Sequence, residues 1–186
     1  MKLVPTSLPG VVIVEPAVFA DERGWFMESF NEPRFHAALA VLGLPPPRPF
    51  VQDNHSCSHA GVVRGLHYQV APHPQGKLVR VVRGAAWDVA VDIRPDSPTR
   101  GQWFGLELSE ANQRQLWIPE GFAHGFVALA DDTHFLYKTT DYYAPQSEGA
   151  LRWDDPEVGI AWPDVGGPPQ LSAKDAVAPG LSAWRK

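Results

Sequence analysis

The sequence predicts an all-β fold, a sandwich or a barrel, on three observations. The 186 residues include 16 glycines and 19 prolines, and residues that break helices at this abundance argue against a helical bundle or a coiled coil. Short apolar runs, separated by Gly, Pro and Asp, recur at intervals of roughly 8–12 residues, which is typical of sandwiches and barrels. The run Ala86–Ile93 alternates apolar residues with Asp88 and Asp92. This period of two places one face of a strand in a core.

The other expected strands follow from the same kind of apolar run. Each is bounded by residues that favour turns, which sets its length to that of an ordinary strand. In chain order the expected strands are Gly10–Val14, Gly24–Phe30, Val62–Gln69, Leu78–Val82, Ala86–Ile93, Trp103–Leu108, Gln115–Ile118, Gly125–Leu129 and His134–Thr140.

One segment predicts a helix. Asn31 is a good N-cap, and Pro33 suits the first helical turn because that turn does not need its N–H group. Apolar residues recur at helical spacing from Phe35 to Leu42, and Gly43 then ends the helix.

After about residue 145 the strand pattern gives way to an irregular tail rich in Gly and Pro. Trp153, Ile160, Trp162 and Leu171 make this tail apolar enough to pack back on the barrel. No repeat, linker or charge block divides the chain. We therefore expect a single domain over residues 1–186, with a barrel core at about 10–145, short helices and a C-terminal tail that returns to it.

Charge and cysteine content exclude several classes of function. The 16 basic and 21 acidic residues give a net charge of −5, which argues against broad binding to nucleic acid or to an anionic membrane. Cys57 is the single cysteine and cannot form an internal disulfide. No apolar run reaches the length of a signal peptide or of a transmembrane helix. These features predict a soluble, cytoplasmic protein.

The densest group of polar residues lies between Gln52 and Lys77. Arg64 and His67 are three residues apart, so they face opposite sides of a regular strand unless Gly65 forms a bulge. With Lys77 on the next strand, a histidine base would sit beside two cations, an arrangement suited to an anionic intermediate. A hydrogen-bonded strand histidine and a surface ion pair would explain the same residues equally well.

A metal site is not expected. The stretch Pro119–His124 matches the third histidine of metal-binding cupin barrels, but their His-x-His pair is replaced here by His67-Tyr-Gln69. Lys77 lies where a carboxylate ligand belongs, and a charged ammonium repels a metal ion. The chain therefore looks like a cupin barrel without its metal.

The remaining candidates each have an ordinary structural alternative. Cys57 is weakly supported as a nucleophile, and Arg23 is either a phosphate clamp or a solvated turn residue. Tyr137 and Tyr143 share one face of a regular strand, where one phenol could donate a proton and the other could stack on a base, although most tyrosines only pack. Asp175, in the tail, is the best unassigned carboxylate for orienting an imidazole.

Taken together, the polar segments resemble the dTDP-4-dehydrorhamnose 3,5-epimerase family. The resemblance covers nearly the whole chain, in order, and its specificity comes from the joint presence of seven stretches. They are Asp21–Glu28, Gln52–Ser56, Val63–Gln69, Gln75–Val81, Pro119–Phe126, Leu136–Tyr143 and Leu171–Asp175.

This resemblance implies a metal-free, cofactor-free jelly roll of the cupin type, usually a homodimer that exchanges N-terminal strands. It implies epimerisation of dTDP-4-dehydro-6-deoxy-D-glucose to dTDP-4-dehydro-L-rhamnose, on the route to dTDP-rhamnose for polysaccharide. By the resemblance, His67 is the base, Asp175 its orienting partner, Tyr137 the acid and Tyr143 the platform for thymine. Lys77, with Arg64 nearby, is expected to stabilise the enolate. The implied substrate contacts are Arg23, Glu28, Gln52, Asp53, Asn54, Arg64, Lys77, His124, Glu148 and Lys174.

Three alternatives remain open from the sequence. An epimerase that inverts carbon 3 alone would share most of these residues. A non-catalytic jelly roll could bind a sugar nucleotide without exchanging its protons. A metal-dependent cupin enzyme would need the ligands that this chain lacks.

Overall fold

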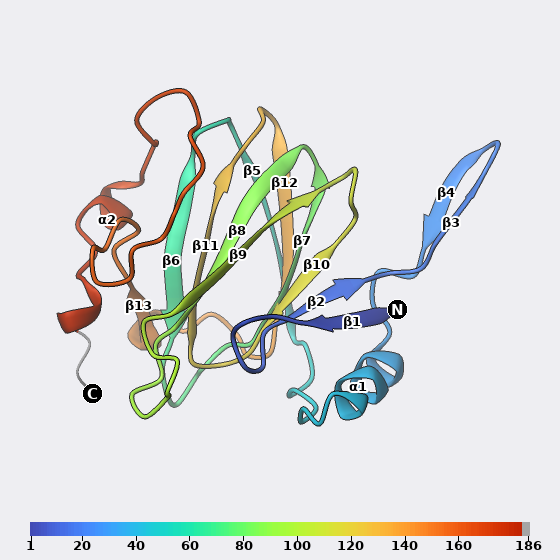
Figure 1. Cartoon of the computed structure of the whole chain (residues 1–186), viewed down its shortest axis with the longest axis horizontal. Coiled ribbons are helices and arrows are strands. Elements are labelled where there is room, and N and C mark those ends of the chain that lie inside the picture. Colours follow the sequence, from blue (N-terminus) through green and yellow to red (C-terminus); the bar gives the residue numbers. More distant parts are fainter. Residues whose placement is uncertain (184–186) are drawn as a thin grey trace.

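A computed structural model describes residues 1–183, which form mainly two antiparallel β-sheets packed face to face (Figure 1). The six-stranded sheet has the spatial order β1 (Lys2–Pro5), β2 (Val12–Glu15), β10 (Gln115–Ile118), β7 (Lys77–Arg83), β12 (Thr133–Thr139) and β5 (Gln52–Ser58). The five-stranded sheet has the order β13 (Glu148–Ala150), β6 (Val63–Gln69), β11 (Phe122–Ala128), β8 (Ala85–Asp92) and β9 (Trp103–Ser109). This arrangement confirms the predicted all-β jelly roll.

The main core lies between the two sheets. Phe135 from β12 and Phe126 from β11 stack with their ring centroids 4.1 Å apart, which joins the sheets at the centre of the sandwich. Val79, Leu108 and Leu116 are fully buried around them. Burial of apolar surface on these inner faces is the main force that holds the sandwich together.

The five-stranded sheet is buried on both faces, whereas the alternation in Ala86–Ile93 predicts one buried face. Ala86 and Ala90 face the core between the sheets, while Val89 and Val91 face outward and are also fully buried. The outward face is covered by apolar residues of the C-terminal tail, including Leu151, Val158, Ile160, Trp162 and Leu181. Packing by distant residues therefore decides the burial of this second face.

The predicted helix is confirmed as α1 (Glu32–Val41). Asn31 caps it, since its side chain accepts a hydrogen bond from the main-chain N–H of Arg34. Phe35 and Leu39 are fully buried and pack with Trp117 against the outer face of the six-stranded sheet.

A two-stranded hairpin projects away from the sandwich (Figure 1). It consists of β3 (Val18–Asp21) and β4 (Gly24–Met27), so the strand expected over Gly24–Phe30 ends three residues earlier. Phe19, Trp25 and Phe26 are 59–70% exposed on it. We call residues 18–27 the arm.

Strand β5 carries no apolar signature in its sequence. The side chains of β5 alternate between exposed and half-buried positions, because it is the edge strand of its sheet, and its sequence is therefore polar throughout. The strands of the two sheets run from Lys2 to Ala150, beyond both limits of the expected core at 10–145. The remaining elements are short: η1 (Pro145–Ser147), α2 (Ala173–Ala176) and η2 (Leu181–Ala183). Over residues 1–183, none of the helices has the length and apolar character needed to cross a bilayer.

Candidate active site

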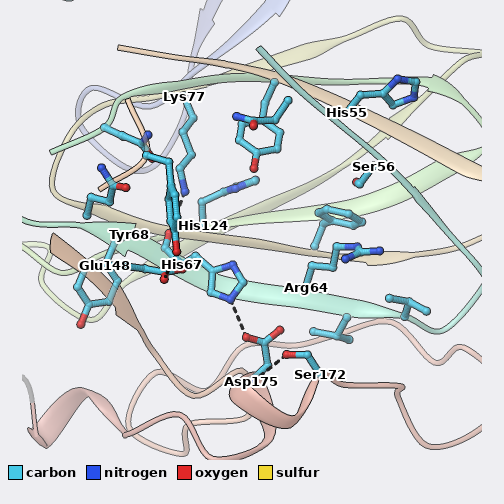
Figure 2. Close-up of a pocket in the computed structure, with 18 of the residues that line it drawn as sticks. His55, Ser56, Arg64, His67, Tyr68, Lys77, His124, Glu148, Ser172 and Asp175 are labelled. Carbon is cyan, nitrogen blue, oxygen red and sulfur yellow. Dashed lines mark hydrogen bonds and ion pairs between the residues drawn. The ribbon is translucent and has the colours of Figure 1, made fainter. Parts of the chain in front are cut away.

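A cavity of about 750 Å³ opens between the two sheets and is closed on one side by the C-terminal tail (Figure 2). Its volume is that of a typical site for a small molecule. Most of the predicted site residues line it: Gln52, Asn54, Arg64, His67, Lys77, His124, Tyr137, Tyr143, Glu148 and Asp175.

His67, on β6, and Asp175, on α2, form an imidazole–carboxylate pair. Nε2 of His67 lies 2.6 Å from Oδ1 of Asp175 (Figure 2). Because a carboxylate only accepts, Nε2 carries the hydrogen and Nδ1 keeps its lone pair. Burial lowers the pKa of His67 below its usual 6.5, although the hydrogen bond to Asp175 acts to raise it. The ring is therefore a neutral base at physiological pH.

Asp175 is held rigidly although it lies in the tail. Its carboxylate is buried, and Oδ2 accepts a long hydrogen bond of 3.4 Å from the Gly65 N–H. The hydroxyl of Ser172 caps α2 by accepting from the main-chain N–H of Asp175. The tail itself is fastened by a parallel bridge between Val62 and Gln170.

Of the two possibilities for β6, a regular strand or a bulge at Gly65, the structure shows the bulge. His124 pairs with His67 and Phe126 pairs with Arg64, so Gly65 and Leu66 of β6 together oppose the single residue Gly125 of β11. Gly65 has a φ of +121°, and a Cβ there would lie 2.6 Å from the Cα of Gly125, so no larger residue fits. The bulge brings Arg64 and His67 to the same cavity.

Lys77, at the start of β7, is a buried cation in the cavity wall. Its Nζ donates to the main-chain oxygen of His67 at 3.0 Å. Burial lowers the pKa of Lys77 to about 8, while the negative charges of Asp88 and Glu148 oppose that shift. A lysine this poorly solvated stabilises a nearby anion more strongly than an exposed lysine would.

A second imidazole–carboxylate pair lies on the neighbouring strands. Nε2 of His124 lies 2.7 Å from Oδ1 of Asp88, and Asp88 is fully buried behind the cavity. Oδ2 of Asp88 has no hydrogen-bond partner within residues 1–183. Sequence reasoning missed Asp88 as a site residue, although an acidic residue inside an apolar strand was a signal that could have found it.

Arg64 and Tyr137 complete the cavity wall. The Arg64 guanidinium donates to the hydroxyl of Ser58 at 2.9 Å and to the main-chain oxygen of Cys57 at 3.2 Å, which ties it to β5. Burial raises the pKa of the Tyr137 phenol, so the phenol keeps its proton. Tyr137 can therefore act as a proton donor.

Tyr143 lies beyond the end of β12, so the predicted single strand for Tyr137 and Tyr143 is wrong. Both nevertheless line the cavity, because residues 140–144 turn back across its rim. The Tyr143 phenol donates to Oε2 of Glu148 at 2.9 Å, and Lys174 forms an ion pair with the same carboxylate. Burial acts to raise the pKa of Glu148, but these partners outweigh it and lower that pKa.

Four predicted contacts do not line the cavity of their own chain. Arg23 lies at the tip of the arm and pairs with Asp21, and Glu28 bonds to residues at the start of α1. Asp53 faces a separate groove, where Lys138 binds it at 2.9 Å. Lys174 forms an ion pair with Glu148, which does line the cavity.

The donor set of the cavity is that of an acid–base site. Within residues 1–183 no group of three or more His, Cys, Asp or Glu side chains is arranged to hold a metal ion. Three histidines line the cavity: His67 and His124 each have a carboxylate on Nε2, and Nε2 of His55 lies 3.0 Å from Nδ1 of His134.

Comparison with known proteins gives one consistent family. The family model described as dTDP-4-dehydrorhamnose 3,5-epimerase matches residues 5–183. The dTDP-4-dehydrorhamnose 3,5-epimerase of Salmonella typhimurium is 54% identical over 181 residues, which cover 97% of this chain and 96% of the relative.

Solved structures show the same likeness. The dTDP-6-deoxy-D-glucose-3,5-epimerase of Legionella pneumophila, in complex with dTDP-4-keto-L-rhamnose, is 50% identical with a TM-score of 0.90 over 97% of this chain and 93% of that one. A 3′-monoepimerase of Streptomyces bikiniensis, in complex with dTDP-quinovose, is 36% identical with a TM-score of 0.86 over 98% of this chain and 88% of that one.

Proposed function

Because the chain belongs to the dTDP-4-dehydrorhamnose 3,5-epimerase family and is thus an isomerase, we propose its substrate and its mechanism. The substrate is dTDP-4-dehydro-6-deoxy-D-glucose, which is inverted at carbons 3 and 5 to give dTDP-4-dehydro-L-rhamnose for dTDP-rhamnose biosynthesis. The observation that carries this proposal is the meeting of a neutral His67–Asp175 pair, a buried Lys77 and a protonated Tyr137 in one cavity.

In the first step Nδ1 of His67 takes the proton from the carbon beside the ketone. The electrons of that C–H bond form a C=C bond, and the ketone oxygen becomes an enolate oxygen. The ammonium of Lys77 stabilises this negative charge, and the Arg64 guanidinium adds to the positive field. Asp175 stabilises the imidazolium that forms and keeps its ring in place.

In the second step Tyr137 returns a proton to the opposite face of the same carbon. The C=C electrons take that proton, the ketone re-forms, and the configuration is inverted. The phenolate of Tyr137 then takes a proton from water and the imidazolium of His67 gives one up. The same cycle at the other carbon beside the ketone completes the reaction, with side chains and water supplying every proton.

Deuterium wash-in tests this assignment. With the dTDP-ketosugar substrate in heavy water, deuterium is expected to enter at both carbon 3 and carbon 5. NMR or mass spectrometry measures its position. Label at carbon 3 alone would assign the chain to the 3-epimerases, in line with its likeness to the S. bikiniensis 3′-monoepimerase. Binding of the dTDP-sugar without any label would leave only a non-catalytic sugar-nucleotide-binding protein.

Replacing Tyr137 by phenylalanine is expected to separate the two steps. The variant keeps the ring but loses the acid, so formation of the inverted product should fall about 10²–10⁴-fold. The rate of proton removal by His67 should fall much less. Deuterium should therefore enter the substrate with retained configuration faster than the inverted product forms. An unchanged rate of product formation would show that Tyr137 is not the acid.

We also propose that the protein is a homodimer in which the arm of one subunit completes the cavity of the other. Arg23 at the arm tip is 85% exposed on its side chain and lies away from the cavity of its own chain, although a charged diphosphate needs cations. The exposed Phe19, Trp25 and Phe26 of the arm supply apolar surface for a second copy to cover. Closed two-fold pairs are the commonest assemblies of identical chains.

Mixed dimers test this arrangement. Co-expressed, separately tagged Arg23→Ala and His67→Ala chains should form a mixed dimer that regains activity, because one of its two cavities then has both native residues. One active cavity in two should give about half of the wild-type rate per mixed dimer. No recovery in a purified mixed dimer would place Arg23 in its own subunit, and a monomeric mass in sedimentation would remove the proposal.

We further propose a cytoplasmic location and one functional domain over residues 1–186. The free, exposed thiol of Cys57 suits a reducing compartment. Asp175 in the tail and His67 in the barrel form one pair, so neither part would be active without the other.

A further inference from the structure

Residues 141–144 leave β12 and carry Tyr143 to the rim of the cavity. Each of these four residues has one main-chain group hydrogen-bonded to a glutamine amide, at 2.9–3.2 Å. The glutamines come from three different parts of the barrel wall. We call them the glutamine cradle: Gln52, Gln69 and Gln75.

Gln69 makes two of the four hydrogen bonds between the glutamine cradle and residues 141–144. It is 6% exposed, and both ends of its amide are used on the two sides of Tyr143. Nε2 donates to the main-chain oxygen of Tyr142 at 3.2 Å and to that of His73 at 2.7 Å, while Oε1 accepts from the N–H of Ala144 at 2.9 Å. A planar amide used at both ends in this way fixes the direction as well as the position of the chain.

The Tyr143 ring depends on its main chain for orientation. The residue is 56% exposed, and its phenol is held at the tip by one hydrogen bond to Glu148. A ring that stacks on a base must present its face at a fixed angle and distance. The main chain beside it is therefore where that angle is set.

We propose that Gln69 is a positioning residue for the nucleotide: it fixes the main chain on both sides of Tyr143 and so holds the ring ready to stack on a pyrimidine base. The proposal deepens the function proposed above, since it rests on Tyr143 as the nucleotide platform. It assigns Gln69 no contact with the reacting carbons. Its loss should therefore weaken nucleotide binding more than it slows proton transfer.

A double-mutant cycle with dTDP as the probe tests this role. Calorimetry would give the dTDP Kd of the wild type, of Gln69→Leu, of Tyr143→Ala and of the double variant. Gln69→Leu removes the acceptor of the buried Ala144 N–H and the donor to the main-chain oxygens of Tyr142 and His73, so the segment should shift and the Kd should rise about tenfold or more. In the Tyr143→Ala background no ring remains to be positioned, so the same substitution should change the Kd less than about twofold.

Gln75→Met is the matched control within the cradle. Gln75 donates to the main-chain oxygen of Asp141 at 2.9 Å, but that oxygen also accepts from the hydroxyl of Thr139 at 2.8 Å. The remaining bond keeps the carbonyl satisfied, so the dTDP Kd should change less than that of Gln69→Leu. If Gln69→Leu does not fold, Gln69→Glu serves in the same cycle, because it keeps the acceptor for Ala144 and loses both donors.

The outcomes distinguish a failure of the positioning role of Gln69 from a failure of the platform role of Tyr143. The positioning role would be overturned if Gln69→Leu raised the dTDP Kd by the same factor with and without the Tyr143 ring. It would also be overturned if Gln69→Leu left the dTDP Kd unchanged. A fall in kcat larger than the rise in KM would also overturn it, because it would place Gln69 in the chemistry. An unchanged dTDP Kd in Tyr143→Ala would instead contradict the platform role of Tyr143, on which this inference depends.

Discussion

His67→Ala is expected to abolish deuterium wash-in at carbon 3 and at carbon 5 together. The same imidazole is proposed to serve both carbons, and its Nδ1 is the base that its pairing with Asp175 leaves open. Loss of a positioned base typically lowers a rate by about 10²–10⁴-fold, so both exchange rates should fall by that amount. The measurement is the initial rate of label entry in heavy water, resolved by carbon.

His59→Ala is the matched control for this prediction. His59 is an exposed histidine whose side chain is 78% accessible and which faces Asp131 outside the cavity. It should keep the wild-type exchange at both carbons. Full exchange in His67→Ala would contradict the base assignment, and loss at one carbon alone would mean that another residue serves the second carbon.

Lys77 is expected to set the alkaline limit of activity. Its ammonium must be charged to stabilise the enolate, and burial lowers its pKa to about 8, so activity should fall as the pH rises through about 8. On the acid side His67 must be neutral. Burial lowers its pKa below 6.5, so that limb should lie below pH 6.5. The pH dependence of kcat/KM for the wild type should therefore be bell-shaped.

Two substitutions separate the charge of Lys77 from its shape. Lys77→Met removes the cation and should lower kcat about 10²–10³-fold, with the alkaline limb lost. Lys77→Arg keeps a charge that does not titrate in this range, so its alkaline limb should move to higher pH at a lower maximal rate. Lys2→Met, at a lysine whose side chain is 74% exposed, should leave the profile unchanged. An unmoved alkaline limb in Lys77→Arg would assign that limb to another group.

Local patterns predicted much of the fold. The helix at Glu32–Val41 followed from a cap, a proline and an apolar stripe, all of which act within a few residues. Most of the strands with an apolar face were found for the same reason, but β1 and β3 were not predicted. The strand at Gln52–Ser58 was not, because an edge strand needs no continuous apolar face and its polar side chains instead line the cavity rim and the neighbouring groove.

The candidate site was predicted with uneven success. The family motifs located His67, Lys77, Tyr137 and Asp175, and the structure brings all four to one cavity. The same motifs gave no place for Asp88, which lies behind the cavity wall with Oδ1 at 2.7 Å from Nε2 of His124.

Turn residues and apolar alternation predicted the class of fold, because both are local properties of the chain, and Gly65 marked a place where a bulge could form. The family motifs supplied the candidate acid–base residues. Tertiary packing brings Asp175 to His67 across 108 positions of sequence and buries Lys77, which lowers the pKa of Lys77 to about 8. It also placed Arg23 outside the cavity of its own chain. Desolvation and long-range pairing depend on which distant segments pack together. A local sequence pattern carries no information about which distant segments those are.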